Sequence, residues 1–140
     1  MSRLGRRLAF DYGDVRIGVA VCDPDGILAT PLEFLASKDP SLKTSILALC
    51  KEYEPTKIYV GLPLNLSGEQ SESTKKALAF SDLLTRLVSC PVKLIDERLT
   101  TSSASASLLQ AGLSAKDARK KIDSQSAVII LESGLAQDRE

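Results

Sequence analysis

The sequence predicts an α/β fold in which a mixed five-stranded sheet, a three-stranded antiparallel meander plus two parallel strands, is flanked by helices. Two observations support this prediction. The first third of the chain holds three apolar runs rich in β-branched residues, and the turns between them are short enough to require antiparallel pairing. The rest alternates helical and strand patterns in the order α–β–α–β–α–α, which adds parallel strands to the same sheet. A chain of 140 residues suits one domain, spanning residues 1–140.

The predicted meander begins with a short apolar strand over Arg7–Tyr12, which ends at a glycine-containing turn signal. A second strand over Val15–Cys22 has valine or isoleucine at every second position along most of its length. The turn DPDG leads into a third strand over Ile27–Ala36, which we expect to be irregular around Pro31. This outer strand leaves an open edge with which another chain can pair.

Helical and strand patterns then alternate. The pair Asp39-Pro40 predicts the start of a helix, with Asp39 as its N-cap. Strands follow at Lys57–Leu62 and Val92–Ile95, with a second helix between them. We expect a serine-rich third helix around Ser102–Ala111. The last helix is expected to start near Ser114 and to carry the apolar residues Ile122, Ile129 and Ile130.

The composition excludes several classes of function. The 18 basic residues balance the 18 acidic ones, which argues against a protein that coats nucleic acid through bulk charge. The chain has no histidine, so histidine triads and most zinc sites are excluded. Three scattered cysteines indicate reduced thiols, and no apolar run approaches the ~20 residues of a membrane span. We therefore expect a cytoplasmic protein that has no contact with membranes.

Acidic residues stand where two predicted strands end. Asp11 lies near the carboxyl end of the first strand, and Asp96-Glu97 directly follows the fifth. If the first, fourth and fifth strands are parallel, these carboxylates reach the same edge of the sheet, where open α/β sheets bind ligands. Local sequence leaves other roles open, namely a turn residue for Asp11 and helix-start acids for Asp96-Glu97. Because side chains alternate along a strand, only one of Asp96 and Glu97 is expected to be a primary metal ligand.

A third carboxylate, Asp123, lies in the segment KIDSQSAVIIL. Its helical neighbours, Ser126, Ala127 and Ile130, form a small and apolar face on which an unpaired carboxylate is costly. The alternative is a surface acid that pairs with Arg119. Three carboxylates at one sheet edge describe a site for Mg²⁺ or Mn²⁺. Two such ions about 3.5–4 Å apart can activate water for phosphodiester cleavage.

Four segments resemble the motif blocks of the YqgF family, also called RuvX. They are FDYGDVRIGVAVCD, VGLPLNLSGEQSES, IDERLTT and KIDSQSAVIIL, in that family's order and over nearly the whole chain. The resemblance implies a ribonuclease-H-like fold and a cytoplasmic bacterial nuclease. Family members are assigned to 5′-end maturation of pre-16S ribosomal RNA and were earlier proposed as Holliday-junction resolvases. The resemblance also implies that Asp11, Glu97 and Asp123 are the catalytic, metal-binding acids. Glu97 is preferred over Asp96 partly on this ground, while contact of Asp96 with metal stays open. Serine at position 126 is a mild departure from the family's pair of small residues.

Basic and polar residues near these acids are the predicted phosphate contacts. The residues that we expect to bind nucleic acid are Arg16, Arg98, Asn65, Ser67 and Lys120. Simpler alternatives are an ion pair for Arg98, a solvated helix face for the lysines before Asp123, and an ordinary polar loop around Asn65 and Ser67. Gly13 is expected to allow the tight turn after Asp11 and the close approach of a phosphate to the backbone.

Two alternatives belong to other classes of function. The pattern Asp-x-Gly followed by GVAV also begins the phosphate-binding hairpin of actin-like and sugar-kinase ATPases, but those proteins need two lobes and this chain supplies one. A non-catalytic nucleic-acid-binding module is the other alternative. Within the nuclease interpretation, precursor rRNA is preferred over branched DNA as substrate, and ribosomal particles are a further expected partner. A monomer is favoured over a homodimer, because a processing nuclease need not cut two strands symmetrically.

Overall fold

The computed structural model describes residues 5–64, 67, 69–99 and 124–139. Five strands form one sheet in the order β3-β2-β1-β4-β5. The strands β1 (Arg7–Tyr12), β2 (Arg16–Cys22) and β3 (Ala29–Ala36) form an antiparallel meander. β4 (Lys57–Leu62) pairs parallel to β1, and β5 (Val92–Asp96) pairs parallel to β4. The predicted mixed five-stranded sheet is therefore confirmed.

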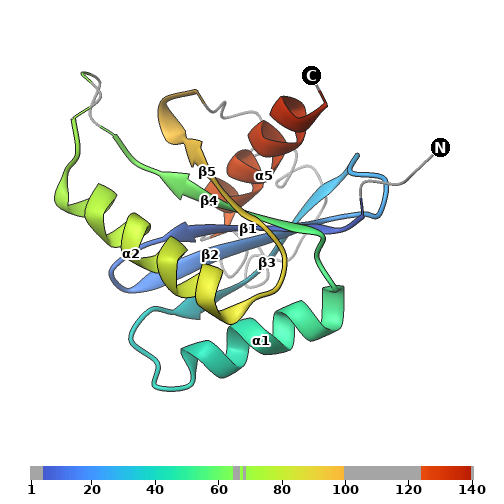
Figure 1. Ribbon diagram of the computed structural model, residues 1–140, viewed down its shortest axis with the longest axis horizontal. Helices are drawn as coiled ribbons and strands as arrows, with labels where there is room; N and C mark the ends of the chain where they lie inside the picture. Colours follow the sequence, from blue (N-terminus) through green and yellow to red (C-terminus); the bar gives the residue numbers. More distant parts are fainter. Residues whose placement is uncertain (1–4, 65–66, 68, 100–123, 140) are drawn as a thin grey trace, which may run out of the picture.

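Helices lie on both faces of this sheet, which gives the described residues three layers (Figure 1). α1 (Leu42–Tyr53) and α2 (Glu72–Leu87) cover one face, and α5 (Gln125–Asp138) crosses the other. Side chains alternate along each strand, so each face has its own apolar core. In β1, Phe10 packs into the core under α1 and α2, whereas Ala9 packs into the core under α5. No helix among the described residues combines the length and the apolar character needed to cross a membrane.

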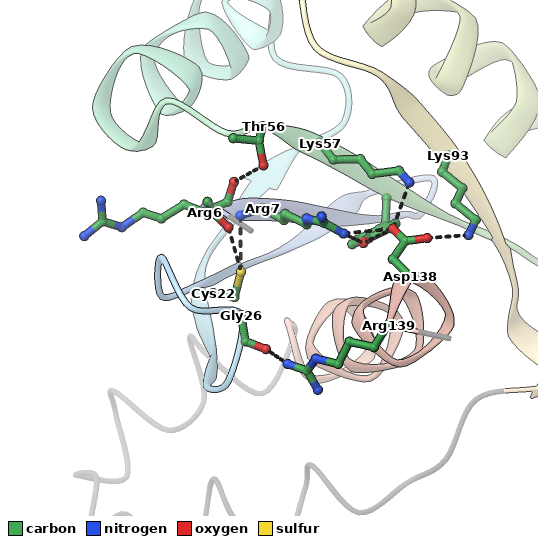
Figure 2. Close-up of polar contacts among 11 residues, drawn as sticks. Arg6, Arg7, Cys22, Gly26, Thr56, Lys57, Lys93, Asp138 and Arg139 are labelled. Atoms are coloured by element: carbon green, nitrogen blue, oxygen red, sulfur yellow. Dashed lines mark hydrogen bonds and ion pairs between the residues drawn. The ribbon is translucent and has the colours of Figure 1, made fainter. Parts of the chain in front are cut away.

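Contacts at the start, middle and end of α5 fix it to the sheet. At its start, the buried hydroxyl of Ser124 donates to the carbonyl oxygen of Leu32 at 2.7 Å and accepts from the Val19 N–H at 3.0 Å. Further along, Gly134 lies so close to Tyr59 that a Cβ there would be 2.7 Å from the ring. At its end, the Asp138 carboxylate is held by cationic side chains from β1, β4 and β5 (Figure 2). The position of this helix on the sheet is therefore set along its whole length.

The meander differs from its predicted boundaries at two points. β2 begins at Arg16 rather than Val15, which is 72% exposed in the preceding turn. β3 begins at Ala29, because the backbone N–H groups of the two residues before it donate to the Asp23 carboxylate at 2.8 and 2.7 Å. These bonds extend the turn by two residues beyond its predicted end.

The irregularity expected around Pro31 lies just after it in β3. Pro31 itself pairs in register with Ala20, and the register shifts between the pairs Val19–Leu32 and Ile17–Leu35. Three residues of β3 thus span the distance of two residues on β2, as in a β-bulge.

Two predicted helix starts are also corrected. The N-cap of α1 is Ser41, and Asp39 instead accepts the Ser41 N–H on its carboxylate at 2.8 Å, in the turn before the helix. The helix that carries Ile129 and Ile130 begins at Gln125, because Ser124 is its N-cap. The helix expected around Ser102–Ala111 and the segment from Ser114 to Asp123 lie outside the described residues.

Candidate active site

Two carboxylates meet at the carboxyl ends of the parallel strands. Asp11 is the next-to-last residue of β1, and Glu97 opens the 3-10 turn Glu97–Leu99 that directly follows β5. β4 lies between these two strands, and the two side chains hydrogen-bond to each other across it. Parallel pairing therefore brings together two residues that are 86 positions apart in the sequence.

Gly61 of β4 makes room for this contact. A Cβ at this position would lie 2.4 Å from Cδ1 of Ile130 on α5 and 3.0 Å from Oε1 of Glu97. The first distance is shorter than real Cβ contacts and the second is tighter than most of them, so a side chain here would force Ile130 to move and would crowd Glu97. Gly61 was not among the site residues predicted from the sequence. The available signal was a glycine inside the buried strand KIYVGL, since glycine in a strand often marks a close approach.

Ser126, in the first turn of α5, is a further residue at the site. Its side chain is exposed and hydrogen-bonds to Asp11. The amino-terminal end of a helix carries partial positive charge, which favours carboxylates nearby. From the sequence, Ser126 was a helical neighbour of Asp123 and a departure from the family motif, whereas the structure places it against Asp11.

Burial and mutual repulsion shift the acidity of both carboxylates. Burial raises the pKa of Asp11, and the hydrogen bonds with Glu97 and Ser126 oppose this shift. Burial and then the negative charge of Asp11 raise the pKa of Glu97 from its ordinary 4.5 to about 7. The pair therefore keeps a shared proton up to about pH 7 and releases it above that pH, as two interacting carboxyl groups commonly do. Fully ionised, its oxygens are the ligands that hard divalent cations prefer.

Asp96 takes part in a different interaction. Its carboxylate accepts from the backbone N–H of Arg98 at 2.9 Å and from the Arg98 guanidinium at 2.7 Å. The bonds with Arg98 lower the pKa of Asp96. Glu97, by contrast, contacts Asp11. The two neighbouring acids thus have different partners. Arg98, a predicted phosphate contact, forms an ion pair with Asp96, which was the simpler alternative for this residue.

Three other predicted residues lie around the same end of the sheet or in the loop after β4. A Cβ on Gly13 would be 2.6 Å from the Arg16 carbonyl oxygen, so a close backbone approach requires glycine there. The guanidinium of Arg16 lies over the ring of Phe34, with 5.0 Å between its central carbon and the ring centroid. Ser67 is exposed in the loop between β4 and α2.

The remaining predicted site residues, Asp123, Asn65 and Lys120, lie outside the described residues. α5 begins only at Gln125, so it does not support the helical spacing that was used to place Asp123 beside Ser126 and Ala127. Within the described ranges, no three acidic or cysteine side chains gather into a group that could hold a metal ion. The described part of the site therefore supplies two carboxylates.

Comparison with known sequences points to one family. The family model of RuvX, described as Holliday junction resolvase, matches residues 5–137. A Streptomyces avermitilis protein, provisionally named pre-16S rRNA nuclease, is 47% identical over 139 residues, which span 98% of this chain and 89% of that protein. A protein of Mycolicibacterium smegmatis with the same provisional name is 47% identical over 141 residues, spanning 96% and 82% of the two chains.

Solved structures agree with the fold. RuvC from Thermus thermophilus in complex with a Holliday junction substrate has a TM-score of 0.59 and 15% identity to this chain, with 96% of each chain covered. A second structure of RuvC from Thermus thermophilus has a TM-score of 0.56 at the same identity and coverage. This likeness concerns the fold alone, and it confirms the predicted ribonuclease-H-like arrangement.

Proposed function

The chain belongs to the RuvX family, and we propose that it is a metal-dependent endonuclease that hydrolyses phosphodiester bonds in the 5′-end maturation of pre-16S ribosomal RNA. The observation that carries the reaction class is the coupled carboxylate pair Asp11–Glu97 at the carboxyl edge of parallel strands. In a chain without histidine, such a pair suits cation-assisted hydrolysis and not a histidine-based triad. The family's description favours cleavage of four-way DNA junctions as the second candidate function.

The residues present fit hard divalent cations. We propose that Asp11 and Glu97, with Asp123 as a third ligand, hold Mg²⁺ or Mn²⁺, and that two ions bind. When bound, such ions activate a water molecule and stabilise the leaving oxygen. The chain itself contributes position: Gly61 lets Glu97 approach Asp11, and Ser126 orients the Asp11 carboxylate. The pair must also release its shared proton to present two anionic ligands, because the pKa of Glu97 is about 7.

Recognition of the substrate is proposed to rest on its phosphate backbone. Aromatic residues make up only 4% of the chain, so extensive base stacking is not expected. The proposed contacts are Arg16, Arg98, Asn65, Ser67 and Lys120. The provisional names of the relatives support precursor rRNA as the substrate. Ribosomal particles as partner, a cytoplasmic location and a monomeric state complete the proposal.

Substitution of Asp11 by asparagine tests the site. We expect Asp11→Asn to reduce Mg²⁺- or Mn²⁺-dependent cleavage of precursor rRNA to background, because the variant loses one anionic ligand while its shape is kept. Asp14→Asn is the matched control, since Asp14 lies three residues away and pairs with Lys76 at 2.6 Å. Circular dichroism checks that both variants fold. Cleavage by Asp11→Asn at the wild-type rate would show that the site assignment is wrong.

A second comparison decides between the two substrates. The wild-type protein is incubated with precursor 16S rRNA and, in parallel, with a four-way DNA junction. We expect a defined cut near the 5′ end of the mature rRNA sequence and no symmetric cleavage of the junction. Cleavage of the junction without cleavage of the RNA would make the protein a resolvase.

A further inference from the structure

A second charged cluster lies at the amino-terminal ends of the parallel strands, whereas the carboxylate pair lies at their carboxyl ends. Arg7, Lys57 and Lys93, from the amino-terminal ends of β1, β4 and β5, surround the carboxylate of Asp138 at the end of α5 (Figure 2). Arg7 Nη1 and Lys57 Nζ each lie 2.8 Å from Oδ2 of Asp138, and Lys93 Nζ lies 2.8 Å from Oδ1. The Tyr59 hydroxyl donates to Oδ2 at 2.6 Å. We call these five residues the basic cluster.

The basic cluster holds more positive charge than its carboxylate balances. Among the described residues, Asp138 is the only acid that pairs with any of its three cations. Asp138 accepts four hydrogen bonds, which is about the full capacity of a carboxylate. The negative end of α5 offsets only about half a charge. Counted over the described residues, a surplus of more than one positive charge therefore remains.

Hydrogen-bond donors are in surplus as well. Each lysine ammonium has three N–H groups and gives one of them to Asp138. Nε of Arg7 is buried and has no hydrogen-bond partner within the described part of the chain. The cluster thus offers more N–H donors than its own carboxylate accepts.

The ammonium groups that carry the surplus charge are partly exposed to solvent, and their positions are fixed by Asp138. The side chains of Lys57 and Lys93 are 24% and 35% exposed, while those of Arg7 and Asp138 are only 11% and 15% exposed. Asp138 thus holds two partly exposed ammonium groups on the two oxygens of one carboxylate. Because they are held in advance, these side chains lose little conformational freedom when an anion binds.

β5 connects the basic cluster to the carboxylate pair. Lys93 contacts Asp138 of α5, Ile95 packs into the core under α5, and Glu97 contacts Asp11, so alternate residues face the same side. Lys93 and Glu97 are four residues apart, or about 13 Å along a strand. β5 is an edge strand of the described sheet. A span of about 13 Å corresponds to about four base pairs of duplex axis, so a duplex that lay along β5 would have phosphates near both ends of the strand.

We propose that Lys57 and Lys93 form a second phosphate-contact site, which binds the backbone of the same nucleic acid at a distance from its cleaved bond. Asp138 and Arg7 anchor the two lysines and do not themselves contact the phosphate. The proposal rests on the proposed function, because it takes a nucleic acid as the occupant. The second contact site implies a minimum length of substrate. On one side of the cleaved bond, the nucleic acid must extend past β5.

Binding measured at several salt concentrations tests this site. The probe is a fluorescently labelled RNA duplex of about 20 base pairs, and its anisotropy is measured in EDTA so that no cleavage occurs. We expect Lys57→Gln/Lys93→Gln to reduce the slope of log affinity against log salt by about 1.5 to 2, and to weaken binding at low salt about tenfold or more. Lys57→Arg/Lys93→Arg keeps both charges and is expected to keep the wild-type slope.

The matched control removes two exposed lysines from α1, in Lys43→Gln/Lys51→Gln, and is expected to leave the slope unchanged. Melting followed by circular dichroism shows whether each variant folds. If the first double variant does not fold, Lys93→Gln alone is expected to reduce the slope by about 0.9. A slope equal to the wild-type value, or an equal decrease in the control, would overturn the proposal.

Cleavage with Mg²⁺ is measured separately on the same proteins. Wild-type protein that binds the RNA but does not cut it would contradict the proposed nuclease function, and the slopes would still decide the role of the basic cluster. Wild-type protein that binds no RNA duplex would overturn the second contact site itself.

Discussion

Glu97 lies beside Asp11 in a partly buried position, and its pKa of about 7 follows from burial and from the charge of its neighbour. Without a cation, ionising both carboxylates places two like charges in hydrogen-bond contact, which destabilises the folded state. The residues proposed to bind metal are therefore expected to lower the stability of the metal-free protein. The arrangement that favours metal binding therefore lowers the stability of the metal-free fold, as is common at functional sites.

The raised pKa of Glu97 predicts how the stability of the metal-free protein depends on pH. A carboxyl group with a raised pKa gives its full stabilising contribution below its unfolded value and loses it as pH rises through its folded value. The free energy of unfolding of the metal-free protein should therefore fall between pH 4.5 and about pH 7. Glu97→Gln should not show this loss, and at about pH 8 it should exceed the wild type by about 1–2 kcal/mol after allowance for solvent screening.

Urea unfolding in EDTA at several pH values measures this difference. Glu52→Gln, an exposed substitution on α1, is the control and should follow the wild-type curve. If Glu97→Gln and the wild type lose stability in parallel between pH 4.5 and 8, the pKa of Glu97 is not raised in the folded protein.

Gly61 supports the pair through its lack of a side chain. In Gly61→Ala the new methyl group would meet Ile130 at 2.4 Å and Glu97 at 3.0 Å, so Ile130 must move and Glu97 must also shift slightly. We expect a loss of stability of about 1–3 kcal/mol and, because Glu97 is displaced, a 10- to 100-fold loss of Mn²⁺ affinity. Calorimetric titration with Mn²⁺ measures the affinity. Wild-type affinity in Gly61→Ala would mean that the position of Glu97 does not depend on this glycine.

At the scale of elements, α5 connects the two charged ends of the sheet. Its first turn carries Ser126, which contacts Asp11, and its last residue, Asp138, binds the three cations of the basic cluster. The positive end of the helix dipole thus lies near carboxylates, and the negative end lies near cations. Both ends of α5 are therefore electrostatically matched to the strands beneath them.

We expect Asp138→Asn to weaken the attachment of α5. Burial tends to raise the pKa of Asp138, but hydrogen bonds from Lys57, Lys93 and Tyr59 outweigh burial and hold this pKa well below its usual range. The substitution should cost about 2 kcal/mol or more at neutral pH, because an amide replaces a carboxylate that accepts bonds from cations. The stabilisation by a lowered pKa is present above the unfolded value of about 3.9 and is lost as pH falls below it.

The difference in unfolding free energy between wild type and Asp138→Asn should therefore stay constant from about pH 5 to 8 and become smaller below about pH 4. Asp82→Asn, an exposed substitution on α2, serves as the control and should cost little at any pH. A difference that does not change down to about pH 2 would show that Asp138 is not ionised through its contacts with the basic cluster.

How much the sequence could predict also depends on scale. The strands were predictable because period-two apolar patterns and short turns are local signals, and pairing Asp11 with Glu97 followed once the strands were taken as parallel. The start of α5 was not predictable, because Ser124 is fixed by hydrogen bonds to Val19 and Leu32, about a hundred residues earlier in the chain. Helical spacing alone could not show where that helix begins.

The basic cluster was missed for the same reason. Its members come from residues 7, 57, 59, 93 and 138, one or two from each of four elements, and no short stretch contains a pattern. Each lysine taken alone is typical of a solvated strand end. Only the parallel register of β1, β4 and β5 brings the three cations to one carboxylate.

At the scale of the whole molecule, a formal net charge of +0 conceals a separation of charge. Coupled carboxylates lie at the carboxyl edge of the parallel strands, and surplus cations lie at the amino edge. The proposed metal ions would reverse the sign of the first edge, after which both edges would attract phosphates. Metal binding is thus expected to change how the entire face beside α5 interacts with a nucleic acid.

Because an ion that binds only the folded state stabilises the whole protein, thermal unfolding reports metal binding without any substrate. We expect Mn²⁺ at about ten times its dissociation constant to stabilise the wild type by roughly 1.4 kcal/mol, a rise of about 4 to 6 °C in melting temperature for a chain of this length. Asp11→Asn and Glu97→Gln should show little or none of this rise, and Asp14→Asn should show all of it. The rise should also be larger at about pH 8 than at about pH 6, since the cation must displace the proton that Glu97 holds up to a pKa of about 7. Equal rises in all four proteins would place the bound Mn²⁺ away from the Asp11–Glu97 pair.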